Sequence, residues 1–479
     1  MRTNRALVLT SGIVCLLISM VATVSHAQEG PRYSHNGPTI ISGVRVIDGR
    51  GGEPRENLDI LVAEGKIAGI GPSGSLTVPR DALRIDGTGL TAMPGLIDMH
   101  IHIQGGWANG LIPGERYAVR YDDASVQQRL SGYLYAGVTT ALDVGNDHEF
   151  VVQKRDQING GELMGPRVFV AGAAWSQAPS GWESGNTGGS GFGQSTKVTD
   201  LAKIPKQMDR YQKDEIEIIK LYSGISPLAS QAVIAEAHAR GMRVVADFWG
   251  LNMDRMIMQR TGLDGWAHTG AFEEVRVEDH EWMAANDRFV ISTATVGEKL
   301  AGVRVKDEGG QRLMMNEPLI VDIWGNDTVE DFYDVYPKIR QNYYEGPDSF
   351  YQTSNFGDLS GFRAFTLTNI KRSFDAGVLV ACGTDDIYAS LWPGEAMHRE
   401  LELLLMAGIP ALQAIKICTF NGAKILHKEA EFGSLQEGLS ADIVLVEGNP
   451  AKRISDTRNV KHVFLRGNQV DRDSLKLTK

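Results

Sequence analysis

The stretch Met93-Pro94-Gly95-Leu96-Ile97-Asp98-Met99-His100-Ile101-His102 decides how this chain folds. Apolar residues lead into two histidines that are separated by a single residue. In an extended strand residues i and i+2 point to the same face, so His100 and His102 are expected to aim at one point. Two ligands of one metal ion need this arrangement, although a lone His-x-His pattern also arises by chance on surface strands.

Length and composition bound the possible folds and partners. A chain of 479 residues exceeds one compact core of ordinary size, so we expect one large domain and a smaller one. Hydrophobic residues make up 42% and charged residues 22%, which is typical of a globular protein in solution. The formal net charge of -11 argues against nucleic acid as the partner.

The N-terminus has the layout of a secretory signal peptide. Arg2 and Arg5 precede an apolar run over 6–24, which is followed by the small-residue segment Ser25-His26-Ala27. The alternative is a membrane anchor, because the run approaches spanning length. The cleavage-like end favours a signal peptide over 1–27. We therefore expect an exported protein, periplasmic or secreted, without a membrane partner after cleavage.

Three cysteines are present, and Cys15 lies within the predicted signal. Cys382 and Cys418 could pair in an exported protein. However, Cys382 lies in a predicted core strand and Cys418 in a predicted helix. We therefore expect two buried free thiols.

The pattern of apolar and turn-forming residues changes twice along the chain. Residues 28–92 contain short β-like runs with Gly- and Pro-rich breaks, and a similar texture returns over 433–479. Between them, over 93–432, apolar strands alternate with helical patterns, which indicates repeated βα units and a parallel sheet. Eight such strands favour a closed α/β barrel, with both chain ends folded into one small β-domain beside it. The predicted strands are 96–102, 139–144, 167–171, 216–222, 243–248, 265–268, 289–293 and 378–383.

Two insertions interrupt the alternation. The first, over 176–196, is rich in Gly, Ser and Trp and is either a mobile lid or a long surface loop. The second, over 296–370, is far longer than a usual connection and contains a helical pattern at 330–337. We expect it to cap the barrel and to shape the substrate pocket.

Three potential metal ligands stand at predicted strand ends, where such barrels carry their chemistry. Lys220 closes an apolar strand; burial lowers a lysine pKa, and the neutral amine can then react with carbon dioxide to form a carbamate. Its alternative is a lysine paired with a carboxylate. His268 could equally be an ordinary hydrogen-bonded histidine, and Asp385 a capping residue for the next segment.

With these residues the chain resembles the amidohydrolase superfamily, in particular its imidazolonepropionase-like and prolidase-like branch. The resemblance runs from about 43 to 470. Its most specific parts are 94–102, Gly383-Thr384-Asp385, and the closing segments 433–435 and 441–444. It implies metal-dependent hydrolysis on a distorted (β/α)8 TIM barrel, with a β-sandwich built from both chain ends.

The resemblance also implies a ligand set. His100, His102 and Asp385 would hold a first ion, Lys220 as a carbamate would bridge two ions, and His268 would bind the second. Asp385 would also act as general base. The implied cofactors are one or two divalent ions, with Zn preferred over Mn or Mg, and carbon dioxide as the carbamate on Lys220.

One position departs from the family pattern. Asp247 stands where relatives carry a ligand histidine on strand 5, and Trp249 where a second histidine often follows. A carboxylate oxygen can also bind Zn, and it suits harder ions such as Mn or Mg better. We prefer retained ligation by Asp247; the alternative is a weak or absent second ion.

Three further residues, Tyr222, His398 and His238, have side chains that could act in or near the site. Tyr222 shares the inward face with Lys220, so its hydroxyl could donate to a developing oxyanion; the alternative is barrel packing. His398 follows the last strand and could reach the substrate or the residues behind the ligands. His238, near a helix C-terminus, is expected to stabilise that helix.

These residues predict a mechanism and a substrate class. Hydroxide generated at the metal would attack a carbonyl carbon, while Asp385 takes a proton and passes it to the leaving amine. The predicted substrate is a small molecule or short peptide with an amide, peptide or cyclic amide bond, and the resemblance favours Xaa-Pro peptides. Ester, lactone or phosphotriester hydrolysis is the alternative reaction. A binding protein on a decayed scaffold, motivated by Asp247 and Trp249, is the alternative class, and a homo-oligomer stays open.

Overall fold

The computed structural model describes residues 30–106, 120–177, 196–222, 225–247, 259–270, 272–300, 316–340, 361–387 and 390–477. The predicted signal peptide, Trp249 and most of the first insertion lie outside these ranges. Within them, no helix combines the length and the apolar composition that crossing a bilayer requires.

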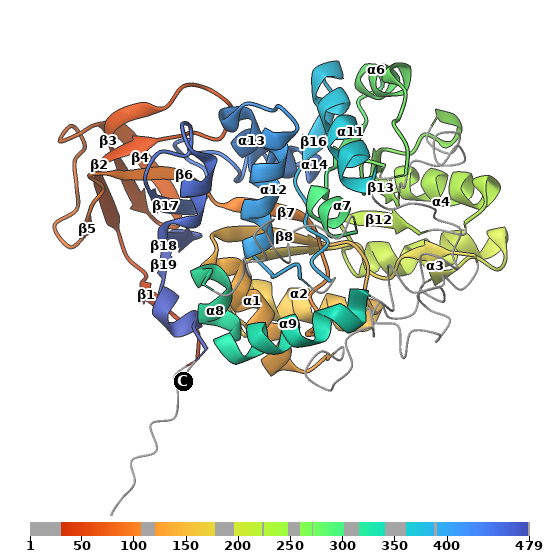
Figure 1. The fold of residues 1–479 in the computed structure, drawn as a ribbon, viewed down its shortest axis with the longest axis horizontal. Coiled ribbons are helices and arrows are strands. Elements are labelled where there is room, and N and C mark those ends of the chain that lie inside the picture. The colour runs from red at the N-terminus through yellow and green to blue at the C-terminus, as the bar shows by residue number, and fades with distance from the viewer. Residues whose placement is uncertain are drawn as a thin grey trace, which may run out of the picture.

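Strands from the two chain ends join in one nine-stranded sheet, seen in Figure 1 as red-to-orange and blue strands side by side. Its order is β1-β19-β18-β17-β6-β2-β3-β4, with β5 paired to β2. The first group is β1 (Tyr33–His35), β2 (Thr39–Val46), β3 (Arg55–Ala63), β4 (Lys66–Pro72), β5 (Leu83–Asp86) and β6 (Leu90–Pro94). The second group is β17 (Ile443–Glu447), β18 (Val460–Leu465) and β19 (Asn468–Val470). The prediction that both ends fold together is confirmed.

A small apolar core holds this sheet. Ile41 and Ile60 from the first group pack with Leu445 and Phe464 from the second, and none of the four is exposed. The antiparallel pairing of β6 with β17 joins the ends directly, because Met93 faces Val444 in the register. Strand β6 then leads into the first parallel strand, so the small sheet lies next to the site-bearing part of the chain.

The eight predicted parallel strands are all present. They are β7 (Leu96–Ile101), β8 (Val138–Asp143), β9 (Arg167–Val170), β12 (Ile218–Leu221), β13 (Arg243–Ala246), β14 (Gly265–Trp266), β15 (Phe289–Ile291) and β16 (Leu379–Ala381). They form two parallel sheets, β7-β8-β9 and β11-β10-β12-β13-β14-β15-β16. The latter includes the short strands β10 (Trp175–Ser176) and β11 (Thr196–Lys197), which flank the first insertion.

Backbone hydrogen bonds link the two parallel sheets at both edges. Glu217 N donates to Val170 O at 3.3 Å, which places the start of β12 beside β9. On the other side, Met99 N donates to Cys382 O at 2.9 Å, which places β7 beside the end of β16. The carboxyl ends of β7 and β16 therefore meet, although they are far apart in the sequence.

Helices alternate with these strands, as the sequence pattern predicts. Side chains of Asp122, Asp147 and Ser226 cap the N-termini of the first, second and fourth helices by accepting backbone N–H groups. The helices are α1 (Asp123–Tyr135), α2 (His148–Gly160), α3 (Ile204–Lys213), α4 (Pro227–Ala239), α6 (Val277–Ala285), α7 (Ala294–Leu300), α11 (Phe362–Ala376), α12 (Glu395–Met406), α13 (Ala411–Ile417) and α14 (Phe420–Ile425).

The second insertion contains α8 (Pro318–Trp324) and α9 (Asn326–Arg340), and α9 confirms the helix predicted at 330–337. Helix α8 packs against α1, where the Tyr135 hydroxyl bonds to Asp322. Leu477 N also donates to Asp322 O at 2.8 Å, so α8 is attached to the end of the described chain as well. The predicted capping of the barrel mouth by this insertion stays a prediction.

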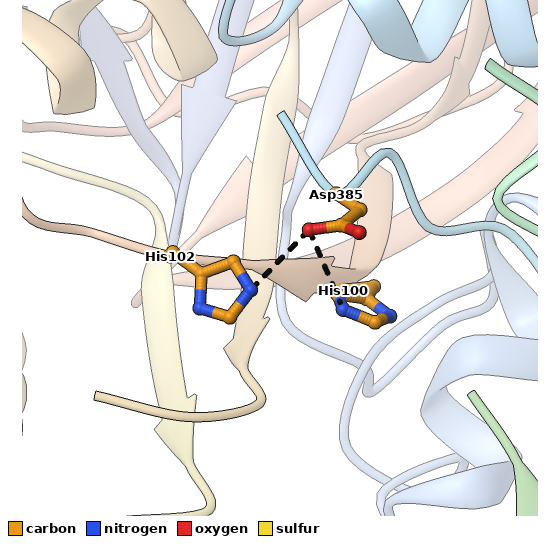
Figure 2. A group of neighbouring side chains, drawn as sticks. All are labelled: His100, His102 and Asp385. Atoms are coloured by element: carbon orange, nitrogen blue, oxygen red, sulfur yellow. Dashed lines mark ion pairs between the residues drawn. The ribbon is translucent and has the colours of Figure 1, made fainter. Parts of the chain in front are cut away.

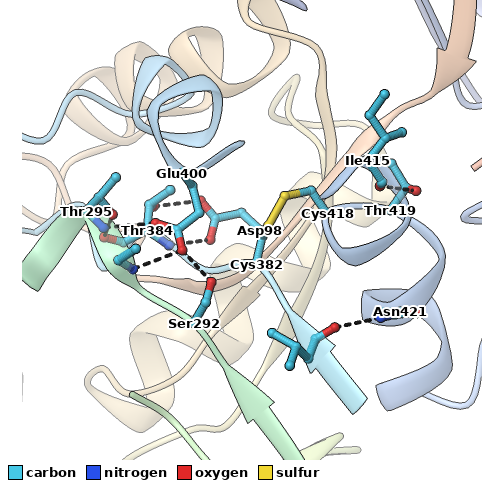
Figure 3. Close-up of a disulfide and its surroundings, with 12 residues drawn as sticks. Asp98, Ser292, Thr295, Cys382, Thr384, Glu400, Ile415, Cys418, Thr419 and Asn421 are labelled. Carbon is cyan, nitrogen blue, oxygen red and sulfur yellow. Dashed lines mark hydrogen bonds between the residues drawn. A yellow bond between two sulfur atoms is a disulfide. The ribbon is translucent and has the colours of Figure 1, made fainter. Parts of the chain in front are cut away.

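The prediction of two free thiols is wrong, because Cys382 and Cys418 form a disulfide (Figure 3). Cys382 follows β16 and Cys418 ends α13, and their Cα atoms are 4.8 Å apart. Strand β7 brings them together: Ile97 N donates to Cys418 O at 2.8 Å, two residues before Met99 N bonds to Cys382 O. A third segment thus mediates the contact, which a reading of the two cysteine neighbourhoods alone does not reveal.

Candidate metal centre

His100, His102 and Asp385 form a compact buried group at the meeting point of β7 and β16 (Figure 2). Their ligand atoms all lie within 4.8 Å of one another, and each residue is at most 4% exposed. The Oδ1 atom of Asp385 is 3.3 Å from His102 Nε2 and 3.6 Å from His100 Nε2. The two histidines therefore converge on one carboxylate, as their i, i+2 spacing predicts.

Glycine at position 383 permits this approach. A Cβ atom there would lie 2.6 Å from the Cβ of His100 and 2.6 Å from a side-chain carbon of Ile291, closer than packed atoms allow. Asp385, two residues later, has a φ of 48°, a left-handed conformation that is uncommon for a residue with a side chain. Its N–H donates to His100 O at 2.7 Å, so surrounding contacts hold this backbone in place.

Asp98 ties the two ligand segments together from behind. Its Oδ1 accepts the N–H of His100 at 3.2 Å and the N–H of Thr384 at 3.0 Å, and its Oδ2 accepts the Thr384 hydroxyl at 2.6 Å. Burial, followed by the nearby charge of Asp386, raises the pKa of Asp98 well above its usual value. The segment 93–102 thus supplies both His100 and His102 and the carboxylate of Asp98, which orients them.

The proton positions suit metal binding. Because a carbonyl oxygen only accepts, the Nδ1–H of His102 donates to Gly145 O at 2.7 Å, and Nε2 is directed at Asp385. Burial lowers the pKa of His102, but the hydrogen bond and charge of Asp385 outweigh it, so the net pKa is raised. Burial, then Lys220 and His268, lower the pKa of His100, which favours the neutral ligand form.

A second group lies beside the first. The Lys220 ammonium forms an ion pair with Asp247 Oδ1, and His268 Nε2 lies 3.7 Å from the same oxygen. Burial is the main reason that the pKa of His268 falls to about 4. The rings of His268 and His100 have centroids 4.8 Å apart, so the two groups adjoin. The structure thus brings together all six residues that the sequence predicted as ligands.

The first group fits a divalent ion. Two imidazole nitrogens and a carboxylate oxygen are the donor set that Zn accepts. The buried Oδ1 of Asp385 faces the Nε2 atoms of both imidazoles, at 3.3 Å and 3.6 Å, so the three donor atoms point at one place. Asp247 does not belong to this compact group of three. Asp247 and His268 lie beside this group, and a second ion between them stays a prediction.

His398 is placed elsewhere, so the prediction that it reaches the substrate needs correction. Its Nδ1 contacts Thr457 Oγ1 at 3.0 Å and its Nε2 contacts Ala136 O at 2.9 Å. Burial lowers its pKa to about 4. Since Ala136 ends α1 and Thr457 lies in the 3-10 turn Ile454–Arg458, this histidine joins α12 to other parts of the scaffold.

The structure places two other residues, Tyr222 and His238, for which the sequence suggested roles. Tyr222 is half-buried directly after β12, and its backbone N–H donates to Trp175 O at 2.9 Å; a catalytic role stays a prediction. His238 pairs with Asp264 at 2.8 Å near the end of α4, in keeping with a stabilising role.

Sequence reasoning missed one basic residue near the site. Lys299 lies on α7, after the seventh predicted strand, and is 4% exposed. Burial lowers its pKa well below the usual value, while the charge of Asp385 opposes that shift. Lys299 lies in a helix next to Glu298, so the strand-end pattern that indicated Lys220 is absent around it.

The family comparison agrees with this geometry. Residues 364–470, which include Asp385, match the model of the amidohydrolase family. Over this segment the chain is similar to the amidohydrolase family. The resemblance drawn from the motifs is thereby confirmed.

Individual relatives match the chain over different lengths. The dihydroorotase of Mycobacterium tuberculosis (strain ATCC 25618 / H37Rv) is 38% identical over 94 residues, which cover 20% of this chain and 19% of that protein. The chain thus aligns with only about a fifth of that relative's length. The ochratoxinase of Aspergillus niger is 24% identical over 450 residues, covering 90% of this chain and 86% of that protein.

A solved structure of a Xaa-Pro dipeptidase with bound methionine superposes with a TM-score of 0.68 at 22% identity. The superposition covers 90% of this chain and 99% of the dipeptidase chain. At this identity the likeness concerns the fold. The likeness in fold extends over nearly the whole chain.

Proposed function

We propose that the chain is a metal-dependent hydrolase that cleaves an amide, peptide or cyclic amide C–N bond of a small substrate. The observation that carries the proposal is the buried group of His100, His102 and Asp385, whose ligand atoms lie within 4.8 Å of one another. The names of the relatives support the reaction class, since dihydroorotase, ochratoxinase and Xaa-Pro dipeptidase are all hydrolases.

The scaffold for this chemistry is a distorted eight-stranded barrel. The hydrogen bonds from Glu217 to Val170 and from Met99 to Cys382 support closure, because they join the two parallel sheets at both edges. In such a barrel the site occupies the carboxyl ends of the strands. Lys220, Asp247, His268 and Asp385 all lie in or just after those ends.

His100, His102 and Asp385 would hold the first divalent ion, and His268 with Asp247 the second. When bound, such an ion supplies Lewis-acid activation of water and of the scissile carbonyl. Burial raises the pKa of Asp385, but the hydrogen bond and charge of His102 outweigh this, so the pKa is lowered and the carboxylate form is available. Asp385 therefore accepts a proton from the attacking water and returns it to the leaving amine.

Lys220 and Asp247 adopt an arrangement that differs from a carbamate. In the structure the lysine carries positive charge against the Asp247 carboxylate, whereas a carbamate is an anion that the same carboxylate repels. We infer that carbamate formation on Lys220 requires positive charge between these two groups. The lysine would then change from the partner of Asp247 to a ligand beside it.

The substrate class follows from charge near the base. Lys299 on α7 is a buried basic side chain, and the charge of Asp385 raises its pKa against the larger effect of burial. A substrate carboxylate would favour its protonated form and would gain a charge-assisted hydrogen bond. This favours small acids, such as dipeptides and N-acyl amino acids, over neutral lactones and phosphotriesters. Export to the periplasm or the medium, based on residues 1–27, is proposed with it.

The test combines elemental analysis of the purified protein with a hydrolysis screen of dipeptides, N-acyl amino acids, lactones and phosphotriesters. We expect bound divalent metal and turnover of an amide substrate. The variant His102→Gln should lose both, whereas His238→Gln, a control at a histidine paired with Asp264, should retain both. A wild-type protein that purifies without metal and shows no metal-dependent turnover would indicate a binding protein instead.

A further inference from the structure

Glu400 is a fully buried carboxylate in α12 that lies behind the site without entering it. Its Oε1 accepts the Ser292 hydroxyl and, at 2.9 Å, the N–H of Ala294; its Oε2 accepts the N–H of Thr295 at 2.9 Å (Figure 3). All three donors lie in residues 292–295, a turn that runs from the end of β15 into the start of α7. One side chain thus satisfies three donors of one turn.

The same turn reaches both groups of predicted ligands. Thr293 Oγ1 lies 2.7 Å from Nδ1 of His268, which supports the ring whose Nε2 faces Asp247. Thr295 Oγ1 donates to Thr384 O at 3.1 Å, next to the general base Asp385. The turn therefore connects the second ligand group with the first.

The conformation of the turn calls for an anchor. Thr293 has a φ of 42°, in the left-handed region that β-branched residues rarely occupy. Such backbone persists only where surrounding contacts hold it. The three hydrogen bonds to Glu400 begin one residue before Thr293 and end two residues after it, so they enclose the strained position.

We propose that Glu400 is a positioning residue that fixes the distance between His268 and Asp385 through the turn 292–295, and that metal affinity depends on it. The proposal rests on the proposed metal-dependent function. It extends that function to a residue in a helix that supplies no ligand.

The carboxylate is needed because all of its partners are donors. In Glu400→Gln one oxygen becomes an NH2 group, which then faces either the N–H of Thr295 or the donors of Ser292 and Ala294. One contact is lost in either orientation, and two donors confront each other in a buried place. The side chain keeps its size, so the variant tests the hydrogen bonds and not the packing.

The experiment measures Zn affinity by competition with a chelating dye, on metal-depleted protein, for wild type, Glu400→Gln and a matched control. The control is Glu298→Gln: Glu298 is equally buried and lies on α7, but its ion pairs are with Arg399 and Arg363. We expect Glu400→Gln to lower Zn affinity about tenfold to a hundredfold, the range seen when partners of metal ligands are removed. Glu298→Gln should keep wild-type affinity.

Two further variants keep the proposal testable if Glu400→Gln does not fold. Thr293→Val removes the contact with His268, and Thr295→Val removes the bond to Thr384, while Glu400 stays in place. Each should weaken Zn binding. Wild-type affinity in Glu400→Gln or in both threonine variants, or an equal loss in Glu298→Gln, would overturn the role of Glu400 and leave the proposed function intact. A wild-type protein without Zn affinity would overturn both.

Discussion

The Lys220 ammonium forms an ion pair with the Asp247 carboxylate, and at most 5% of either side chain is exposed to solvent. The lysine was predicted as a carbamate that bridges two ions, and the aspartate as a substitute for a ligand histidine. The pairing gives the carboxylate of Asp247, directly after β13, a positive partner in Lys220 on β12. This pair therefore determines whether Lys220 is a cation or an anionic ligand.

If metal loading drives Lys220 to the carbamate, binding of the second ion should require dissolved carbon dioxide. Metal-depleted protein reconstituted in degassed, bicarbonate-free buffer should regain little activity, and added bicarbonate should restore it. The measurement is turnover and metal content against bicarbonate concentration. Lys220→Met should abolish the dependence, and full reconstitution without bicarbonate would show that Lys220 stays paired with Asp247.

Replacing Asp385 with Asn should remove turnover while the fold is kept. The amide cannot accept the proton of the attacking water, and loss of general acid–base catalysis typically costs about 100- to 10,000-fold in rate. The kcat of Asp385→Asn measures this, with circular dichroism as the check on folding. Asp375→Asn is a suitable control, because Asp375 is exposed and pairs with Lys371 on the surface. Full activity in Asp385→Asn would eliminate this residue as the base.

Much of this arrangement was accessible from the sequence, and particular residues show why. The alternation of apolar strands and helical patterns located all eight strands, because side-chain periodicity is a local property. His100 and His102 were predicted to converge because their spacing alone fixes a shared face. The strand-end positions of Lys220, His268 and Asp385 followed from the same local pattern.

What the sequence could not reveal depends on contacts between distant segments. The Cys382–Cys418 disulfide forms because β7 hydrogen-bonds to both cysteine segments. Glu400 reaches a turn that lies 105 to 108 residues earlier in the chain. His398 follows the last strand in sequence, yet α12 directs it toward Ala136 and Thr457. Each outcome depends on how helices pack against the strands, which no short motif encodes.

Metal affinity should rise with pH above the ordinary histidine range. Asp385 raises the pKa of His102 above 6.5, and the protonated ring cannot ligate. Protons therefore compete with the metal to a higher pH than at an ordinary histidine, and affinity levels off once His102 has lost its proton. Because the pKa of Asp385 is lowered, this carboxylate adds no further step in that range. Titrations in buffers of different ionisation enthalpy should detect proton release, and affinity independent of pH between 6 and 9 would contradict the assignment.

Lys299→Met should impair binding of carboxylate-bearing substrates specifically. A hydrogen bond to a charged group contributes about 1.5 to 3 kcal/mol, so KM should rise roughly tenfold to a hundredfold. The matched comparison is one peptide with a free carboxylate and the same peptide as its amide. The variant should bring the two KM values together, whereas an equal loss for both would mean that Lys299 serves packing only.

The disulfide should stabilise the fold and hold the strand that leads to Asp385. Closing a loop across a sequence separation of 36 residues is worth about 4 kcal/mol in the chain-entropy description. Both cysteines are fully buried, so reductant alone should act slowly on the folded protein. Cys418→Ser, purified in parallel with wild type, should therefore lower the Tm markedly. An unchanged Tm in Cys418→Ser, or two titratable thiols in denatured wild-type protein without reductant, would mean that the cysteines are not paired in solution.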